Sequence, residues 1–174
     1  MNQTIKDIIS RRSVKKYLNT PVPEELIAQV VEAGTYAPTG MNRQSPIILA
    51  VTNREVRDKL SRMNAGILGV TSDPFYGAPV VLVVLAKKEI GTNVYDGSLV
   101  MENMMVAANS LGLGSCWIHR AKETFESEEG RQILKGLGIT EEYVGIANCI
   151  LGYAAPDACK PQSARKEDYV IWVK

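Results

Sequence analysis

The chain has 174 residues, the size of one domain, and such a chain buries roughly 70% of the surface that it exposes when unfolded. It is 45% hydrophobic and 22% charged with a formal net charge of +1, which gives no basic face for nucleic acid. The longest apolar run, 78–86, is too short to cross a bilayer, and residues 1–7 lack the apolar core of a signal peptide. We expect one cytoplasmic domain, residues 1–174, that binds neither nucleic acid nor membrane.

Hydrophobic periodicity predicts the elements of the first half in chain order. Apolar residues three and four apart predict a short helix over 5–9. A second helix begins near Pro23, because proline fits the first turn and the two glutamates after it complement the helix dipole. This helix ends in the glycine-containing segment 34–40. A strand over 47–51 and an amphipathic helix over 55–63 follow.

The second half is built around an apolar strand. Residues 79–85 are apolar and mostly β-branched, which is typical of a central strand buried on both faces. The longest helix, 96–111, is apolar around most of its circumference, so we expect burial on several sides, with a subunit interface as one option. Further strands are predicted over 114–118, 144–151 and 169–173, and a further helix over 128–137. This mixture predicts an α+β or three-layer α/β/α fold.

Several classes of chemistry find little support. Cys116, Cys149 and Cys159 have no metal-binding spacing, and their odd number favours reduced thiols, with Cys149 in the core. His119 is the single histidine, so we expect no metal site and no conventional catalytic triad. The GxG at 112–114 lies between a helix and a strand, the reverse of a dinucleotide fingerprint. Redox chemistry carried by a bound cofactor needs none of these side chains.

A cluster of cations follows the first predicted helix. It consists of Arg11, Arg12 and Lys15, with Ser13 between them. Arginine forks match phosphate oxygens two at a time and lysine adds a point charge, so the cluster suits a phosphate group. A solvated basic helix end would explain the same residues, because cations are favourable near a helix C-terminus.

The rest of the chain decides between these interpretations. Three segments accompany the cluster: 37–44 after the second helix, 111–117 after the longest predicted helix, and 151–153 before a tail that contains Lys160 and Arg165. In this order and spacing the set resembles the nitroreductase family of FMN-dependent oxidoreductases, over nearly the whole chain. Each motif is weakly specific alone, whereas four in register are strong. The resemblance implies a mixed sheet flanked by helices, in an intertwined homodimer with one FMN at each of two interface sites.

The resemblance implies roles for the basic residues. Arg11 and Ser13 would contact the phosphate, ribityl chain or pyrimidine edge of FMN, with Arg12 alongside. Lys15 would lie beside N1 and O2 of the ring, where a fixed positive charge stabilises the reduced flavin.

The tail completes the phosphate site in the family's pattern. Arg165 corresponds to the family's distal phosphate arginine. The family often has a second basic residue two positions earlier, where this chain has Ser163. We therefore expect Lys160 to substitute for it.

A loop would serve the flavin of the opposite subunit. The corresponding residues here are Pro38, Thr39, Gly40, Asn42 and Gln44. Gly40 permits close approach of the backbone, and Asn42 offers both donor and acceptor to a pyrimidine edge. For Met41 and Arg43 we prefer a simple turn. Ser45 stands where the family commonly has proline, which leaves the local backbone open.

Residues 116–120 align with the family segment that lies against the ring. There a backbone N–H reaches N5, and register places this contact at His119, with Arg120 as a possible second donor. A role for the His119 side chain as proton donor is the less favoured interpretation. Trp117 is either a wall of the ring site or part of the core.

The implied activity is carried by the flavin, with no dedicated catalytic side chain. NADH or NADPH would deliver hydride to FMN, and an electron-poor acceptor, such as a nitroaromatic or a quinone, would then be reduced by a ping-pong mechanism. A flavin-binding or storage protein with little turnover is the alternative. The terminal strand 169–173 would cross to the partner's sheet in the family's manner, or pair within its own subunit.

Overall fold

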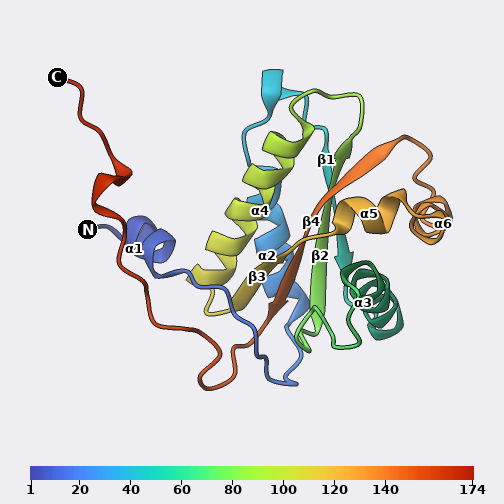
Figure 1. Ribbon diagram of the computed structural model, residues 1–174, viewed down its shortest axis with the longest axis horizontal. Coiled ribbons are helices and arrows are strands. Elements are labelled where there is room, and N and C mark those ends of the chain that lie inside the picture. The colour runs from blue at the N-terminus through green and yellow to red at the C-terminus, as the bar shows by residue number, and fades with distance from the viewer.

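The computed structural model describes all 174 residues and contains one four-stranded sheet with helices on both faces (Figure 1). The strands lie in the order β1-β2-β4-β3 and all neighbours are antiparallel. Their bounds are Pro46–Val51 (β1), Val80–Lys87 (β2), Gly114–Ile118 (β3) and Tyr143–Gly152 (β4). The α-helices are Gln3–Ser10 (α1), Glu24–Thr35 (α2), Arg54–Leu68 (α3), Asn93–Ser110 (α4), Ala121–Glu126 (α5) and Glu128–Gly136 (α6). Two 3₁₀ turns cover Gly40–Asn42 (η1) and Glu167–Tyr169 (η2).

Strand β2 separates two hydrophobic cores, which gives the three layers predicted from the sequence. Successive side chains of a strand point to opposite faces. Val80, Leu82 and Val84 therefore join the core under α2 and α4, whereas the residues between them join the core under α3, α5 and α6. Because helices cover both faces, every residue of β2 except the last is buried.

Most elements agree with the expected ranges, and the differences have local causes. Helix α3 continues beyond the predicted end at residue 63 to Leu68, where Gly69 adopts a left-handed conformation with φ of 75°. Helix α5 was not predicted, because six residues are too few to show a helical period. The three cysteines are free thiols, and Cys149 is buried as expected. No helix combines the length and the apolar character that spanning a membrane requires.

Two expectations about the sheet require correction for a single chain. The sheet is not mixed: its ladders are antiparallel, and the only parallel contact is an isolated bridge between Ser13 and Ser115. Residues 169–173 do not form a strand or pair within their own subunit. After β4 the chain leaves the body as an arm (Figure 1, red). The side chains of Ile171, Trp172 and Val173 are 82–93% exposed, because no strand edge of the same chain lies beside them.

Candidate functional site

The segment Arg11–Lys15 runs beside β3. The N–H of Val14 donates to the carbonyl of Ser115 at 2.9 Å, and its side chain is buried. A Cβ on Gly114 would lie 2.8 Å from Val14 Cγ2, so glycine at this position permits the close approach. Because side chains alternate along an extended segment, the inward Val14 leaves Ser13 and Lys15 facing outward.

Arg12 has a second role at the end of α1. Its Nη1 donates to the carbonyls of Ile9 at 2.9 Å and Arg11 at 2.7 Å. These bonds satisfy carbonyls that a helix leaves unpaired at its C-terminus. The helix-end interpretation therefore holds for Arg12, which also lines the cavity formed by this segment.

The start of the C-terminal arm is tied to this segment by backbone hydrogen bonds. The N–H of Lys15 donates to Ala158 at 3.3 Å, and that of Ala155 donates to Lys16 at 3.0 Å. Together the two stretches enclose a cavity of about 600 Å³, here called the cationic cavity. Its basic residues are Arg11, Arg12, Lys15, Lys16, Lys160 and Arg165. The one carboxylate in the lining is that of Asp157, so the cavity attracts anions.

A second cavity, here called the ring cavity, has a volume of about 320 Å³ and shares Ser13 and Lys15 with the first. Tyr76, Trp117, His119 and Arg120 are among its walls. The ammonium of Lys15 lies 5.5 Å from the centroid of the Tyr76 ring, within the range of a cation–π contact. Trp117 both lines this cavity and packs on a hydrophobic core, so the two interpretations of its role are compatible. A larger cavity of about 680 Å³ meets the ring cavity at Trp117, His119 and Arg120.

The turn after β3 presents two backbone donors. Arg120 has a left-handed conformation with φ of 73°, and the carbonyl of His119 accepts from the side-chain amides of Asn64 at 2.7 Å and Asn148 at 3.3 Å. No hydrogen bond within the chain comes from the N–H of His119 or of Arg120. Backbone donors strongly favour a partner, so the turn is suited to a ligand that accepts hydrogen bonds.

No side chain at the ring cavity is arranged as a nucleophile. Burial raises the pKa of the Cys116 thiol, although Ser13, Lys15 and Arg11 oppose the effect. Burial also raises the pKa of Cys149 to about 12. The imidazole of His119 accepts at Nδ1 from the Trp117 indole N–H at 3.2 Å. This site therefore suits chemistry that a bound group supplies.

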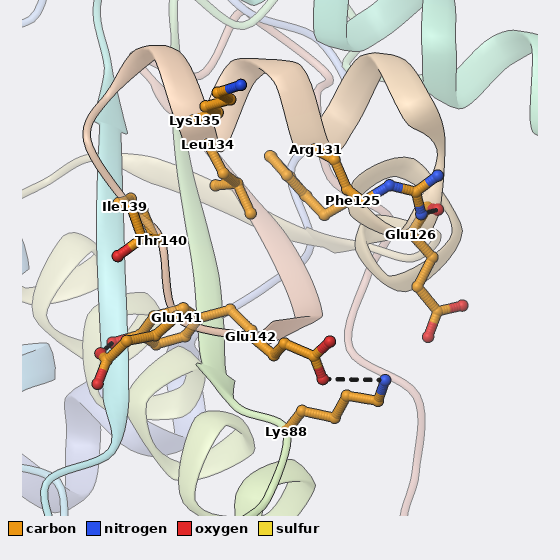
Figure 2. A pocket seen from close by; sticks show the side chains of 11 residues that line it. Lys88, Phe125, Glu126, Arg131, Leu134, Lys135, Ile139, Thr140, Glu141 and Glu142 are labelled. Carbon is orange, nitrogen blue, oxygen red and sulfur yellow. Dashed lines mark hydrogen bonds and ion pairs between the residues drawn. The ribbon is translucent and has the colours of Figure 1, made fainter.

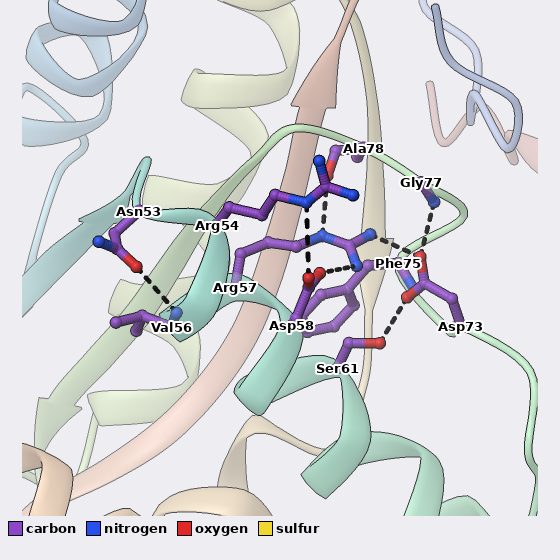
Figure 3. Close-up of polar contacts among 10 residues, drawn as sticks. All are labelled: Asn53, Arg54, Val56, Arg57, Asp58, Ser61, Asp73, Phe75, Gly77 and Ala78. Atoms are coloured by element: carbon purple, nitrogen blue, oxygen red, sulfur yellow. Dashed lines mark hydrogen bonds and ion pairs between the residues drawn. The ribbon is translucent and has the colours of Figure 1, made fainter. Parts of the chain in front are cut away.

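A partly buried ion pair, between the buried Arg57 and the more accessible Asp73, fixes the loop that carries Tyr76 (Figure 3). Asp73 accepts from Arg57 Nη2 at 2.6 Å and Ser61 Oγ at 2.5 Å, and from the N–H groups of Phe75 at 2.9 Å and Gly77 at 2.7 Å. Burial opposes ionisation of Asp73, but the hydrogen bonds from Arg57, Ser61 and the two N–H groups outweigh it and lower its pKa. A carboxylate with this many donors is a rigid anchor for one wall of the ring cavity.

Sequence reasoning missed these supporting residues. Arg57, Ser61 and Asn64 lie on the same buried face of α3 as Leu60 and Ala65. A core-facing stripe is normally apolar, and the three polar residues at intervals of three and four interrupt it. That interruption was visible in the sequence, although the partners of these residues were not.

The loop Pro38–Gln44 is anchored elsewhere, at the start of α4. The N–H of Gly40 donates to Asp96 Oδ1 at 3.0 Å, and Asp96, which is buried, also accepts from Thr92 at 2.9 Å. Inside the loop, Thr39 Oγ1 accepts from the N–H of Gln44 at 3.0 Å. Met41, Asn42 and Gln44 have φ values of 52°, 52° and 48°. Left-handed backbone at three residues other than glycine is costly and is often found at functional sites.

One chain does not bring this loop to the two cavities. At the other end of α4, Asn109 donates to the carbonyl of Asp7 in α1, which leads into Arg11–Lys15. An 18-residue helix is about 27 Å long, so α4 separates the two regions. Pro38, Thr39, Gly40, Asn42 and Gln44 line neither the cationic nor the ring cavity. The other predicted residues do: Arg11, Arg12, Ser13, Lys15, Lys160 and Arg165 meet at the first cavity, and Trp117, His119 and Arg120 at the second.

A further cavity of about 400 Å³ lies between α5, α6 and the start of β4 (Figure 2). Its charged groups are largely paired, as in the ion pair between Lys88 and Glu142 at 3.3 Å. None of the predicted residues lines it. We do not assign it to the functional site.

Comparisons with known proteins agree with the geometry. A sequence model described as "Nitroreductase family" matches residues 8–153. A protein of Archaeoglobus fulgidus, provisionally named NADH dehydrogenase/NAD(P)H nitroreductase, is 30% identical over 159 residues, which are 88% of this chain and 86% of that protein. An FMN reductase (NAD(P)H) of Bacillus subtilis is 25% identical over 185 aligned positions, covering 94% of this chain and 72% of that protein. The crystal structure of a Bacteroides fragilis nitroreductase with bound FMN is similar over 100% of both chains, with a TM-score of 0.91 and 28% identity.

Proposed function

The chain belongs to the nitroreductase family, and on that premise we propose that it is an FMN-dependent oxidoreductase that takes hydride from NADH or NADPH and reduces electron-poor acceptors such as nitroaromatics or quinones. The observation that carries the proposal is the pair of adjoining cavities that share Ser13 and Lys15. One cavity is cationic, and the other has aromatic walls and free backbone donors.

The donor set fits FMN at both ends of the molecule. A phosphate group needs cations, and six basic side chains line the first cavity beside one carboxylate. A flavin ring needs flat apolar walls and hydrogen-bond donors for its acceptor edge, which Trp117, Tyr76 and the free N–H groups of His119 and Arg120 supply. The basic lining of the cationic cavity and the aromatic lining of the ring cavity together suit a molecule that is anionic at one end and aromatic at the other.

The chain's own residues would hold and polarise the cofactor. Arg11 and Arg165 would bind the phosphate with their forked donors. Lys15 would place a fixed positive charge in the ring cavity and stabilise negative charge that develops there. When bound, FMN supplies two-electron redox chemistry, accepting hydride from the nicotinamide and passing it to the acceptor. In this proposal no side chain is required as a general base, because the bound flavin would supply the redox chemistry.

We further propose that the active form is a homodimer in which the loop Pro38–Gln44 serves the partner's flavin. The loop lies at the far end of α4 from the cavities of its own chain. Exposed apolar side chains are numerous on the elements that would meet a second copy: Ile5, Ile8, Ile9, Tyr36, Met41, Val94, Tyr95 and residues 169–173. Exposed apolar side chains in this number favour contact with a partner surface.

The first test is the absorbance spectrum of the purified protein, followed by anaerobic addition of NADH or NADPH. A yellow protein that bleaches on addition supports the oxidoreductase. A yellow protein that does not respond would support the alternative, a flavin-storage protein, and a colourless protein that binds no added FMN would exclude both.

The second test concerns the order of the reaction. One ring face would serve both substrates in turn, because the chain has no separate dinucleotide fingerprint. We therefore expect ping-pong kinetics, with parallel lines in initial-rate plots at several acceptor concentrations. Intersecting lines would show a ternary complex and exclude the shared face.

A further inference from the structure

We propose that Asn64 is a positioning residue for the flavin ring: it holds the carbonyl of His119 inside the protein and thereby directs the N–H of Arg120 toward the ring. The inference rests on the proposed function, because it concerns how the ring cavity presents a donor to FMN. Asn64 itself lines neither the ring cavity nor the larger cavity beside it. Its effect would be exerted entirely through the backbone of the turn.

Asn64 is fully buried and uses both ends of its amide on this one turn. Its Nδ2 donates to the carbonyl of His119 at 2.7 Å, and its Oδ1 accepts from Nε of Arg120 at 3.1 Å. The side chain therefore bridges two consecutive residues at the end of β3. A buried amide is tolerated because it is satisfied, and an unsatisfied one would be costly.

The geometry of a trans peptide means that this contact also sets the direction of the Arg120 N–H. The chain contains no cis peptide bond, so the carbonyl of His119 and the N–H of Arg120 point to opposite sides of the same planar unit. The carbonyl faces the buried amides of Asn64 and Asn148. The N–H of Arg120 consequently faces away from the interior. On that side the ring cavity and the larger cavity of about 680 Å³ share His119 and Arg120.

The same contact strengthens the donor. A peptide whose carbonyl accepts hydrogen bonds becomes more polarised, and its N–H becomes a better donor. The Arg120 N–H belongs to a peptide whose carbonyl accepts at 2.7 Å and 3.3 Å. The neighbouring His119 N–H belongs to the peptide of Ile118, whose carbonyl accepts from Asn148 at 3.3 Å. The N–H of Arg120 is therefore the more polarised of the two free donors.

The experiment follows the backbone amide of Arg120 by NMR in ¹⁵N-labelled protein, with and without FMN. In the wild type, FMN should move the Arg120 amide proton downfield and slow its exchange, because a free donor acquires an acceptor. In Asn64→Leu, which removes both bonds and keeps similar volume, this FMN-dependent shift should be strongly reduced.

Asn103→Leu is the matched control. Asn103 also ties two elements together through a side-chain amide, donating to the carbonyl of Ala33 at 3.1 Å, but it lies away from both cavities. A general loss of rigidity would affect both variants alike. Only the loss of a directed donor should affect Asn64→Leu alone.

Anaerobic stopped-flow measurements supply the second readout. Asn64→Leu should lower the limiting rate of flavin reduction roughly three- to tenfold, which is the worth of one hydrogen bond. The concentration of NAD(P)H at half-maximal rate and the FMN dissociation constant should stay within about twofold, since one hydrogen bond to the ring is not the main source of either affinity. Asn103→Leu should leave all three values unchanged.

Each outcome separates the inference from the proposed function. If the wild type binds no FMN, both fail. If it binds FMN and reduces it while the Arg120 amide does not move, or if Asn64→Leu keeps the wild-type shift and rate, only the role of Asn64 is overturned. Should Asn64→Leu fail to fold, Asn64→Ala takes its place, because a methyl group can neither donate to the His119 carbonyl nor accept from Arg120.

Discussion

In the proposed dimer each flavin contacts the segment Arg11–Lys15 of one chain and the loop Pro38–Gln44 of the other, yet these two regions are held in opposite ways. Backbone bonds to β3 and to the C-terminal arm fix the first, and it completes two cavities of its own chain. The second depends on one buried carboxylate, Asp96, and presents three left-handed residues to solvent. The contrast supports the proposed site of two halves, in which a single chain would assemble only one half.

Removing the end of the arm should break this arrangement most completely. Without residues 169–174 the partner would lose its exposed apolar contact, so we expect dimerisation and FMN binding to be lost together. Light scattering after gel filtration, with the ratio of absorbance at the flavin band to that of the protein, measures both. A truncated protein that stays dimeric with stoichiometric FMN would count against the exchanged arm.

Mixing two defective chains should restore what each lacks. Arg165→Ala weakens the half of the site that would bind the phosphate, namely the cationic cavity. Asp96→Ala releases the other half, the loop Pro38–Gln44. Each homodimer should therefore retain little FMN. In a co-expressed mixture, one site of each heterodimer combines two intact halves, and about a quarter of all sites should recover.

Recovery of flavin content and activity in the doubly tagged heterodimer is the measurement. If both halves of a site came from one chain, each heterodimer site would carry one defect and nothing would be regained. An intact protein that is monomeric and yet yellow would also exclude the shared site.

Two cations of the cationic cavity, Arg165 and Lys15, should have different effects when they are removed. Arg165→Ala should weaken FMN binding roughly ten- to a hundredfold, because a charge-assisted contact to phosphate is lost. Lys15→Met should instead lower the reduction potential and slow hydride transfer, because its charge lies in the ring cavity. FMN titration and dye-coupled potentiometry separate the effects. Equal losses of affinity with no change in potential would show that Lys15 is wrongly placed.

The smallest effect is expected at the wall that Asp73 anchors. Asp73→Asn should loosen the loop that carries Tyr76 and slow flavin reduction a few-fold, with FMN retained. The pKa of Asp73 is lower when folded, so its contribution to stability is complete above the unfolded pKa and is lost as pH falls through the folded pKa. Acid unfolding of the wild type and Asp73→Asn should converge below that range. A constant difference in stability down to the lowest pH would contradict this assignment.

The fold was largely accessible from the sequence because its elements carry strong local signals. The uniform apolarity of β2 predicted a central strand, and the glycine that opens β3 marked its first residue. The prediction of a terminal strand over 169–173 was wrong for a single chain, because β-propensity cannot supply a neighbouring strand. Short α5 had too few residues for a periodic pattern.

The candidate site divides in the same way. The grouping of Arg11–Lys15 with Lys160 and Arg165 around one cavity agrees with the expectation, whereas their contacts with FMN stay a prediction. The supporting residues were missed because their partners are distant in the chain. Asp96 binds the N–H of Gly40, and Asn64 binds the carbonyl of His119. Such pairs leave no local pattern and emerge only when the chain is folded.

The strand order β1-β2-β4-β3 has a consequence for folding kinetics. No two strands form a hairpin: β2 meets β1 across α3, and Lys87 at the end of β2 pairs with Tyr143 at the start of β4. Long loops must close before these ladders form, which places such chains among slower folders. Because β4 pairs with both β2 and β3, the sheet cannot be completed until β4 has been synthesised. Until then β2 lacks its pairing with β4 and its apolar residues stay exposed. We expect the nascent chain to be most vulnerable to aggregation during that interval.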